Sequence, residues 1–147
     1  MITLRHFTEK DTDCLQKHMY PDMTPADLAC LIKDWESLSY QGQYFEMLAV
    51  ESDGAVVGNA SLREQAAHVI SLGIEIFPEE RGKGYACEAV EQLCRLGSAK
   101  GYQVALDQVR ADNIPSIKLH EKLGFERTVS TYQNAKGKEV FLFIKLL

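Results

Sequence analysis

Long hydrophobic segments are missing from the sequence. No apolar run approaches the roughly 20 residues that a membrane-spanning helix requires. Residues 1–7 also lack the apolar core of a signal peptide. We therefore expect a cytoplasmic protein with no membrane among its partners.

The four cysteines form no metal-binding pattern. Neither a Cys-x-x-Cys pair nor a clustered Cys/His spacing occurs among Cys14, Cys30, Cys87 and Cys94. No metal site is therefore predicted. Cys87 and Cys94 fall on the apolar stripe of a predicted helix, where we expect thiols to act as small hydrophobic side chains.

Basic residues do not exceed acidic ones. The 16 Lys and Arg against 21 Asp and Glu give a formal net charge of −5, whereas a general nucleic-acid-binding protein usually has a basic face. No nucleic-acid partner is therefore expected. The length of 147 residues, with 46% hydrophobic and 25% charged residues, predicts one globular domain over residues 1–147.

The most informative stretch changes its hydrophobic period in the middle. Its first half alternates at a period of two and predicts a strand whose apolar face consists of Ile70, Leu72, Ile74 and Ile76. Its second half has offsets of three and four and predicts a helix whose apolar stripe consists of Ala86, Ala89, Val90, Leu93, Cys94 and Gly97. A glycine-rich turn thus joins a strand to a helix.

The turn Arg81-Gly82-Lys83-Gly84 has the properties of a phosphate-binding loop. A helix that begins directly after it presents unpaired N–H groups and the positive end of its dipole. Gly82 and Gly84 allow positive φ and a close backbone approach, and Arg81 and Lys83 add cationic donors. The predicted ligand therefore carries phosphate.

Two nucleotide-binding motifs are absent here. The sequence has no Gly-x-x-x-x-Gly-Lys run followed by Ser or Thr, and Cys87 replaces the third glycine of Gly-x-Gly-x-x-Gly. The pattern (Gln or Arg)-x-x-Gly-x-(Gly or Ala) is present at residues 81–86 as Arg-Gly-Lys-Gly-Tyr-Ala. It resembles the coenzyme A pyrophosphate loop of the GNAT N-acetyltransferase superfamily.

A second match lies downstream. Residues 113–125 read Asn-Ile-Pro-Ser-Ile-Lys-Leu-His-Glu-Lys-Leu-Gly-Phe. They resemble the family's Asn-x-x-(Ala or Ser)-x-x-Leu-Tyr-x-Lys-x-Gly-Phe segment in order and spacing. One position departs from the pattern, because His120 stands where many members have tyrosine.

The other elements are predicted from periodicity, caps and turns. Two helices begin after the N-cap residues Thr8 and Thr24, and the second has an apolar stripe that extends to Leu38. A long helix ends at Lys100-Gly101, and a short one starts at Pro115. The predicted strands are 2–7, 44–51, 55–63, 70–77, 103–109, 125–132 and 139–147.

The resemblance implies a mixed α/β GNAT fold, with helices on both faces of a twisted sheet of about seven strands. The order is β-α-α-β-β-β-α-β-α-β-β. A V-shaped splay between the fourth and fifth strands admits the pantetheine arm of acetyl-CoA, and we expect Gly73 to form a bulge where it begins. The residues implied in coenzyme binding are Ile74, Ile76, Arg81, Gly82, Lys83, Gly84, Tyr85, Ala86, Asn113 and Ser116.

Acetyl transfer to an amine needs a base, because an alkylamine with a pKa of about 10.4 is mostly protonated at neutral pH. Strand alternation puts Glu75 on the face opposite Ile74 and Ile76, beside the expected acetyl carbonyl, which makes it our candidate base. The alternative interpretation is a solvated carboxylate at a strand end. Weaker candidates are Glu64, His68, Asp107 and an ordered water.

His120 is the candidate acid. It shares a helix face with Ser116, Leu119 and Leu123, and the resemblance implies that this face looks toward the coenzyme. Imidazole can donate a proton to the departing sulfur, as tyrosine does, or accept the proton of the amine. A histidine that only packs against coenzyme A is the alternative.

The resemblance also implies that the acceptor site lies between residues 19–24 and 132–138, where Tyr20, Met23 and Tyr132 offer an amphipathic wall. The predicted function is acetyl-CoA-dependent transfer of an acetyl group to a primary amine of a small molecule or a peptide N-terminus. A non-catalytic acyl-CoA sensor is the alternative. The last strand is apolar on both faces, so the chain is expected to be a monomer or a homodimer.

Overall fold

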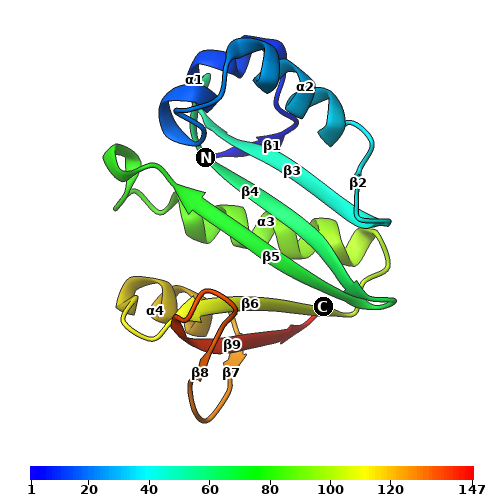
Figure 1. Ribbon diagram of the computed structural model, residues 1–147. Helices are drawn as coiled ribbons and strands as arrows, with labels where there is room; N and C mark the ends of the chain where they lie inside the picture. The colour runs from blue at the N-terminus through cyan, green and yellow to red at the C-terminus, as the bar shows by residue number, and fades with distance from the viewer.

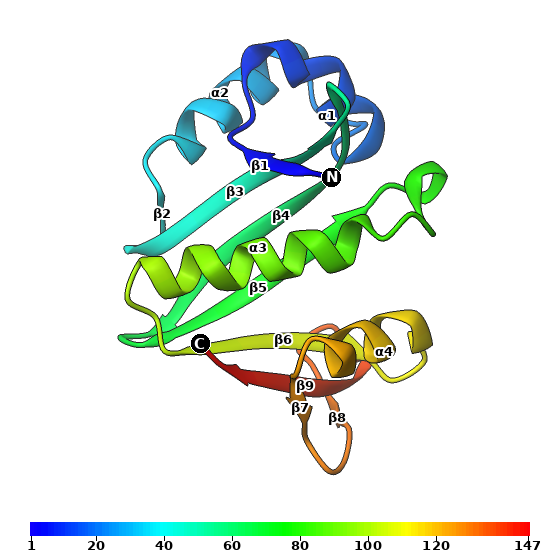
Figure 2. The same cartoon turned by 180° about the vertical axis from the view of Figure 1, so that it is seen from behind.

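The structure, a computed structural model, describes residues 1–147. Its centre is a mixed β-sheet with helices on both faces (Figure 1, Figure 2). The main path runs β1-β3-β4-β5-β6-β9-β7, while β2 pairs with β3 and β8 pairs with β9. The strands are β1 (Thr3–Arg5), β2 (Ser39–Tyr40), β3 (Gln43–Ser52), β4 (Ala55–Ala66), β5 (Val69–Ile76), β6 (Val104–Arg110), β7 (Glu126–Arg127), β8 (Tyr132–Gln133) and β9 (Glu139–Leu146).

The helices lie in two layers, which confirms the expected fold class. One layer is formed by α1 (Thr12–His18) and α2 (Pro25–Trp35), and the other by α3 (Tyr85–Ala99) and α4 (Ile114–Lys122). Single-turn 3₁₀ helices, η1 (Glu9–Asp11) and η2 (Pro78–Glu80), follow β1 and β5. None of these helices combines the length and the hydropathy that crossing a membrane requires.

Two hydrophobic clusters hold these layers together. The larger one packs α3 against the sheet, and Val90, Leu62 and Leu72 are among its buried members. The smaller one joins α1 and α2 to the opposite face and includes the fully buried Leu15 and Leu28. Because α3 is buried along its apolar stripe, its first turn is fixed beside the end of β5.

Local signals set the helix starts. The Thr8 N–H donates to Asp11 Oδ2 at 2.8 Å, and the Asp27 N–H donates to Thr24 Oγ1 at 3.1 Å, so both predicted capping residues act as caps. The first helix nevertheless opens with the 3₁₀ turn η1. The second ends before Leu38, whose left-handed φ of +52° excludes it from the predicted stripe.

The predicted splay is present between β5 and β6. Only Val69–Ser71 pair with β6, in parallel register with residues 104–106, and the strands separate beyond that point. The Phe77 N–H donates to Val57 of β4. Because successive residues aim their N–H and C=O groups to opposite sides, the backbone groups of Ile74 and Ile76 face the gap.

Two strand predictions were wrong. Gly73 forms no bulge, since it pairs in regular register with Ser61, and a Cβ on Gly73 would lie 2.4 Å from the Ser61 Oγ atom. Glycine is required there by close packing. The strand predicted over 125–132 is interrupted because Thr128 Oγ1 accepts the Leu142 N–H at 3.2 Å, in place of a backbone carbonyl. This leaves the two-residue strands β7 and β8.

Candidate active site

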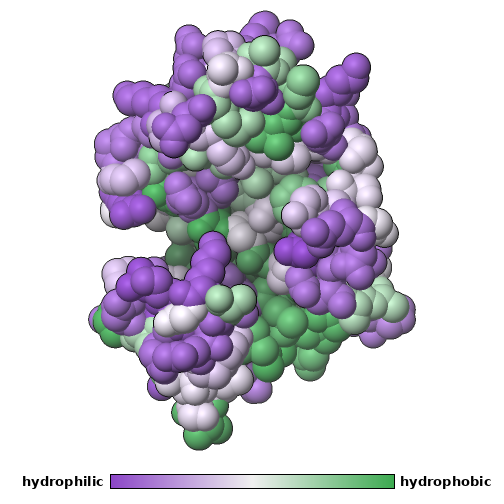
Figure 3. All heavy atoms as spheres, in the orientation of Figure 1, coloured by the Kyte–Doolittle hydropathy of each residue, from purple (hydrophilic) through white to green (hydrophobic).

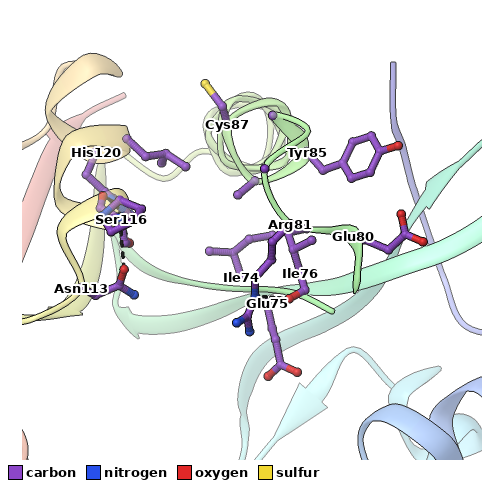
Figure 4. A pocket seen from close by; sticks show the side chains of 15 residues that line it. Ile74, Glu75, Ile76, Glu80, Arg81, Tyr85, Cys87, Asn113, Ser116 and His120 are labelled. Carbon is purple, nitrogen blue, oxygen red and sulfur yellow. Dashed lines mark hydrogen bonds between the residues drawn. The ribbon is translucent and has the colours of Figure 1, made fainter. Parts of the chain in front are cut away.

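A cavity of about 600 Å³ lies where β5 ends and where α3 and α4 begin (Figure 4). The surface is hollowed there, between the segment that follows β5 and α4 (Figure 3). Both candidate catalytic residues and all predicted coenzyme-binding residues except Lys83 line it. They are Ile74, Glu75, Ile76, Arg81, Gly82, Gly84, Tyr85, Ala86, Asn113, Ser116 and His120.

The loop before α3 presents free main-chain donors. Gly82 and Gly84 have φ of +80° and +82°, with no atom within 4 Å of the place where a Cβ would stand. None of the N–H groups from Gly82 to Cys87 donates to a protein acceptor. The open glycines and the unpaired amides at a helix N-terminus fit a phosphate group.

The charged side chains of the loop are engaged within the protein. Arg81 Nε donates to the Ile76 carbonyl at 3.0 Å and so ties the loop to the end of β5. Lys83 Nζ donates to Glu80 at 2.8 Å, and the Lys83 side chain lies outside the cavity lining. The anion-binding character of the loop therefore rests on its backbone.

The second motif forms the opposite wall through α4. Asn113 is its N-cap, with Oδ1 accepting the Ser116 N–H at 3.2 Å. Ser116, Leu119 and His120 line the cavity from successive turns of the helix, as the predicted shared face requires.

His120 is 1% exposed, and both of its ring nitrogens are engaged. Nε2 lies 2.6 Å from Asp107 Oδ2, and Nδ1 lies 2.8 Å from the Ser116 carbonyl oxygen. A carbonyl can only accept, so Nδ1 carries a proton, and the contact with Asp107 requires a second shared proton. Neither ring nitrogen is therefore free to donate a proton to the departing sulfur of coenzyme A. The role of His120 as an acid stays a prediction.

Burial and charge act against each other in this pair. Burial favours neutral imidazole, but the hydrogen bond and the charge of Asp107 outweigh it, so the pKa of His120 lies above its ordinary value. Burial raises the pKa of Asp107 despite the histidine. Both directions mean that the folded pair holds its shared proton tightly.

Glu75 lies on the other face of the sheet. Its side chain points away from α3, whereas Ser116 and His120 lie on α4 across the gap (Figure 4). Burial, with a contribution from the charge of Glu75, raises the pKa of Tyr20. The loop after α1 thus brings a half-buried phenol close enough to feel the charge of this carboxylate.

Two residues near the gap between β5 and β6 were not predicted from the sequence as parts of the site. Asn59 is the cross-strand partner of Glu75, and its side chain donates to Met19 Sδ at 3.5 Å. Cys87 lines the cavity instead of the core, whereas Cys94 is buried as predicted. Strand register could have identified Asn59 once the β4–β5 hairpin was aligned.

The predicted C-terminal part of the acceptor site lies farther out. Tyr132 on β8 is 38% exposed and does not line the cavity. Asn134 Nδ2 contacts Gln108 Oε1 at 3.5 Å, which links the last hairpin to β6.

Comparisons with known proteins agree with this geometry. The family model described as an acetyltransferase (GNAT) domain matches residues 2–126. An uncharacterised N-acetyltransferase of Bacillus licheniformis is 28% identical, covering 97% of this chain and 90% of that protein. A prophage-derived, uncharacterised N-acetyltransferase of Bacillus subtilis is 33% identical over 64% of this chain, and the match spans 55% of that protein's length.

A further relative is named for its substrates. The L-methionine sulfoximine/L-methionine sulfone acetyltransferase of Pseudomonas aeruginosa is 30% identical over 70% of this chain and 62% of that protein. Among solved structures, a probable acetyltransferase superposes with a TM-score of 0.84 at 19% identity, covering 99% of this chain and 92% of the other. A putative acetyltransferase from Salmonella typhimurium with its cofactor acetyl-CoA has a TM-score of 0.71 at 19% identity, covering 100% and 93%. At this identity the likeness shows the fold.

Proposed function

The chain belongs to the GNAT acetyltransferase family, and we propose that it uses acetyl-CoA to acetylate a primary amine of a small molecule or a peptide N-terminus. One observation carries the proposal. The row of unpaired amides from Gly82 to Cys87 adjoins a gap into which the backbone groups of β5 are directed. An anion and an extended amide chain are the two features that such a site recognises.

The residues present fit coenzyme A. The amides of Gly82, Gly84, Tyr85 and Ala86 would hold its pyrophosphate, and the backbone of Ile74 and Ile76 would pair with its pantetheine amides. When bound, acetyl-CoA supplies an activated acetyl group. The Ile74 N–H then stabilises negative charge on the carbonyl oxygen.

Glu75 is the proposed base. Its carboxylate takes a proton from the ammonium form of the acceptor, directly or through water, so that the neutral amine can attack. Tyr20, which senses the charge of Glu75, would offer a hydroxyl and an apolar ring to the acceptor. Asn59, fixed opposite Glu75 by strand pairing, is positioned to orient the carboxylate or the amine.

His120 has a positioning role in this proposal. Its contacts with Asp107 on β6 and with the Ser116 carbonyl fix α4 against the diverging strand. The thiol of coenzyme A has a pKa of about 8.5, so its thiolate is a moderate leaving group that water can protonate.

The negative charge of the cavity lining and of the whole chain indicates the class of acceptor. A carboxylate lines the cavity, and the chain has a net charge of −5, which favours a cationic acceptor through electrostatic steering. The named relative acts on amino-acid analogues, and we extend that class to this chain as the first to be tested. A cytoplasmic location and the absence of a metal remain predictions from the sequence.

The test is release of free thiol from acetyl-CoA by the purified chain. The acceptor panel contains L-methionine sulfone, L-methionine sulfoximine, spermidine, an aminoglycoside and a peptide with a free N-terminal alanine. Turnover with at least one amine is expected, and mass spectrometry should find one added acetyl group on the amine.

The alternative, a non-catalytic acyl-CoA sensor, is favoured by the lack of a free nitrogen on His120. Calorimetric titration with acetyl-CoA separates the two functions. Tight binding without thiol release from any amine would support the sensor, and no binding at all would overturn both.

A further inference from the structure

One face of the sheet is left uncovered at β6 and β9. The helices α1 and α2 pack only on the β3 and β4 part of that face. Ile144 is 37% exposed and Leu146 is 79% exposed, while the neighbouring Leu106 and Leu142 are half-buried. Figure 3 shows an apolar patch in its lower part, over β6 and β9.

Strand register arranges this surface as a row across the sheet. Arg63 pairs with Ser71, Ser71 with Leu106, Leu106 with Ile144, and Ile144 with Glu126. Paired residues point to the same side of a sheet, so the five side chains share one face. Four strand spacings of about 4.8 Å make the row about 19 Å long, with Ser71 and the apolar Leu106 and Ile144 in its middle and opposite charges at its ends.

Neither terminal charge has an ion-pair partner within the chain. No carboxylate lies within 4 Å of the Arg63 guanidinium, which instead stands 5.3 Å from the centre of the Tyr40 ring. Glu126 likewise has no cation within that distance. Both residues are exposed.

We propose that this row is the centre of a homodimer interface in which two sheets pack face to face. A two-fold axis through Leu106, parallel to the strands, reverses the row. It brings Arg63 against Glu126 of the partner subunit, and the reciprocal contact follows from the symmetry. A two-fold axis along the row would instead place the two symmetry-related copies of Arg63 against each other.

A second copy fits this surface better than an unrelated partner does. The row carries one positive and one negative end, so it complements itself only when it is reversed, and a two-fold axis does that. The aligned packing of two sheets also keeps their strand directions within about 30°, which leaves the charged ends close together. Exposed apolar side chains in the middle are then removed from water.

Sedimentation equilibrium of the full chain tests the proposal. Wild type is expected to be dimeric. Arg63→Glu and Glu126→Arg should each raise the dimer dissociation constant about tenfold, because each creates two like-charge contacts in the dimer. The double variant Arg63→Glu/Glu126→Arg should return to near the wild-type value. Ile144→Lys, which puts a charge in the apolar centre, should leave only monomer.

Matched controls change the same charges elsewhere. Lys33→Glu and Glu36→Arg lie at exposed positions of α2 and just after it, and both should leave the dissociation constant unchanged. Thermal unfolding and acetyl-CoA binding confirm that every variant is folded. A monomeric wild type, or single swaps that behave like the controls, would overturn the interface.

Discussion

On the α3 side of the sheet the candidate active site combines main-chain groups of one continuous stretch, residues 74–87, with a wall formed by α4. On the α1 side the proposed groups are side chains from separate elements, with Tyr20 after α1, Asn59 on β4 and Glu75 on β5. In the proposed function, the first side binds features that every acyl-CoA shares, and the second contacts the acceptor amine, which differs between enzymes.

This difference predicts how each side tolerates substitution. The stretch with unpaired amides, residues 82–87, is called the amide loop below. Its side chains can change as long as its backbone keeps its conformation, since the donors are N–H groups. On the acceptor side, a single side-chain change removes the functional group itself. Four variants or conditions separate these two behaviours.

The largest expected effect is on the acceptor side. Glu75→Gln removes the proposed base while keeping the shape, and should lower kcat by about 10²- to 10⁴-fold with acetyl-CoA affinity unchanged. Steady-state thiol release and calorimetric titration measure the two quantities. Glu91→Gln, at an exposed carboxylate of α3, is the control, and an unchanged kcat for Glu75→Gln would eliminate this base.

The second-largest expected effect is a loss of stability at the buried pair His120 and Asp107. His120→Phe leaves Asp107 buried without its partner and should lower the free energy of unfolding by about 3–5 kcal/mol. The double variant Asp107→Leu/His120→Phe should recover most of that loss, because it removes both charges. Urea unfolding measures the stability of each variant.

The folded double variant also tests the role of His120. Retained kcat would fit a positioning residue, whereas a large loss of kcat in a stable protein would restore the predicted acid.

The amide loop should respond to backbone strain. Gly84→Val forces a β-branched residue toward a φ of +82°, and either the strain or the relaxed loop should weaken acetyl-CoA binding by about 5- to 150-fold, equivalent to about 1–3 kcal/mol. Gly101→Val, at a φ of +95° after the other end of the same helix, imposes similar strain away from the site. Equal losses of affinity in both variants would contradict the loop's role.

The smallest effect is a pH dependence of stability. The raised pKa of His120 means that its contribution is complete below about pH 6.5, the unfolded value, and is lost as the pH rises through the folded pKa. Asp107 acts in the same direction, because burial raises its pKa. Urea unfolding from pH 6 to 9 should show a decline in wild type that is smaller in Asp107→Leu/His120→Phe, and equal slopes would show that the pair does not titrate.

Much of the fold was predictable because its signals are local. The change from period two to period 3.6 around Gly82 defined β5 and α3, and Thr24 and Asn113 marked the starts of α2 and α4. The interruption after β7 was not predictable, since it depends on Thr128 meeting Leu142 across the sheet. Likewise, the packing of Ser61 over Gly73 involves residues of different strands.

The sequence by itself determined the amide loop and the order of elements, because both depend on residues that are neighbours in the chain. Only the tertiary structure decided that His120 is locked to Asp107, that Asn59 stands beside Glu75, and that Arg63 and Glu126 end one row. Those relations arise from strand pairing and burial over long sequence separations, where hydrophobic periodicity gives the face of a residue but not its partner.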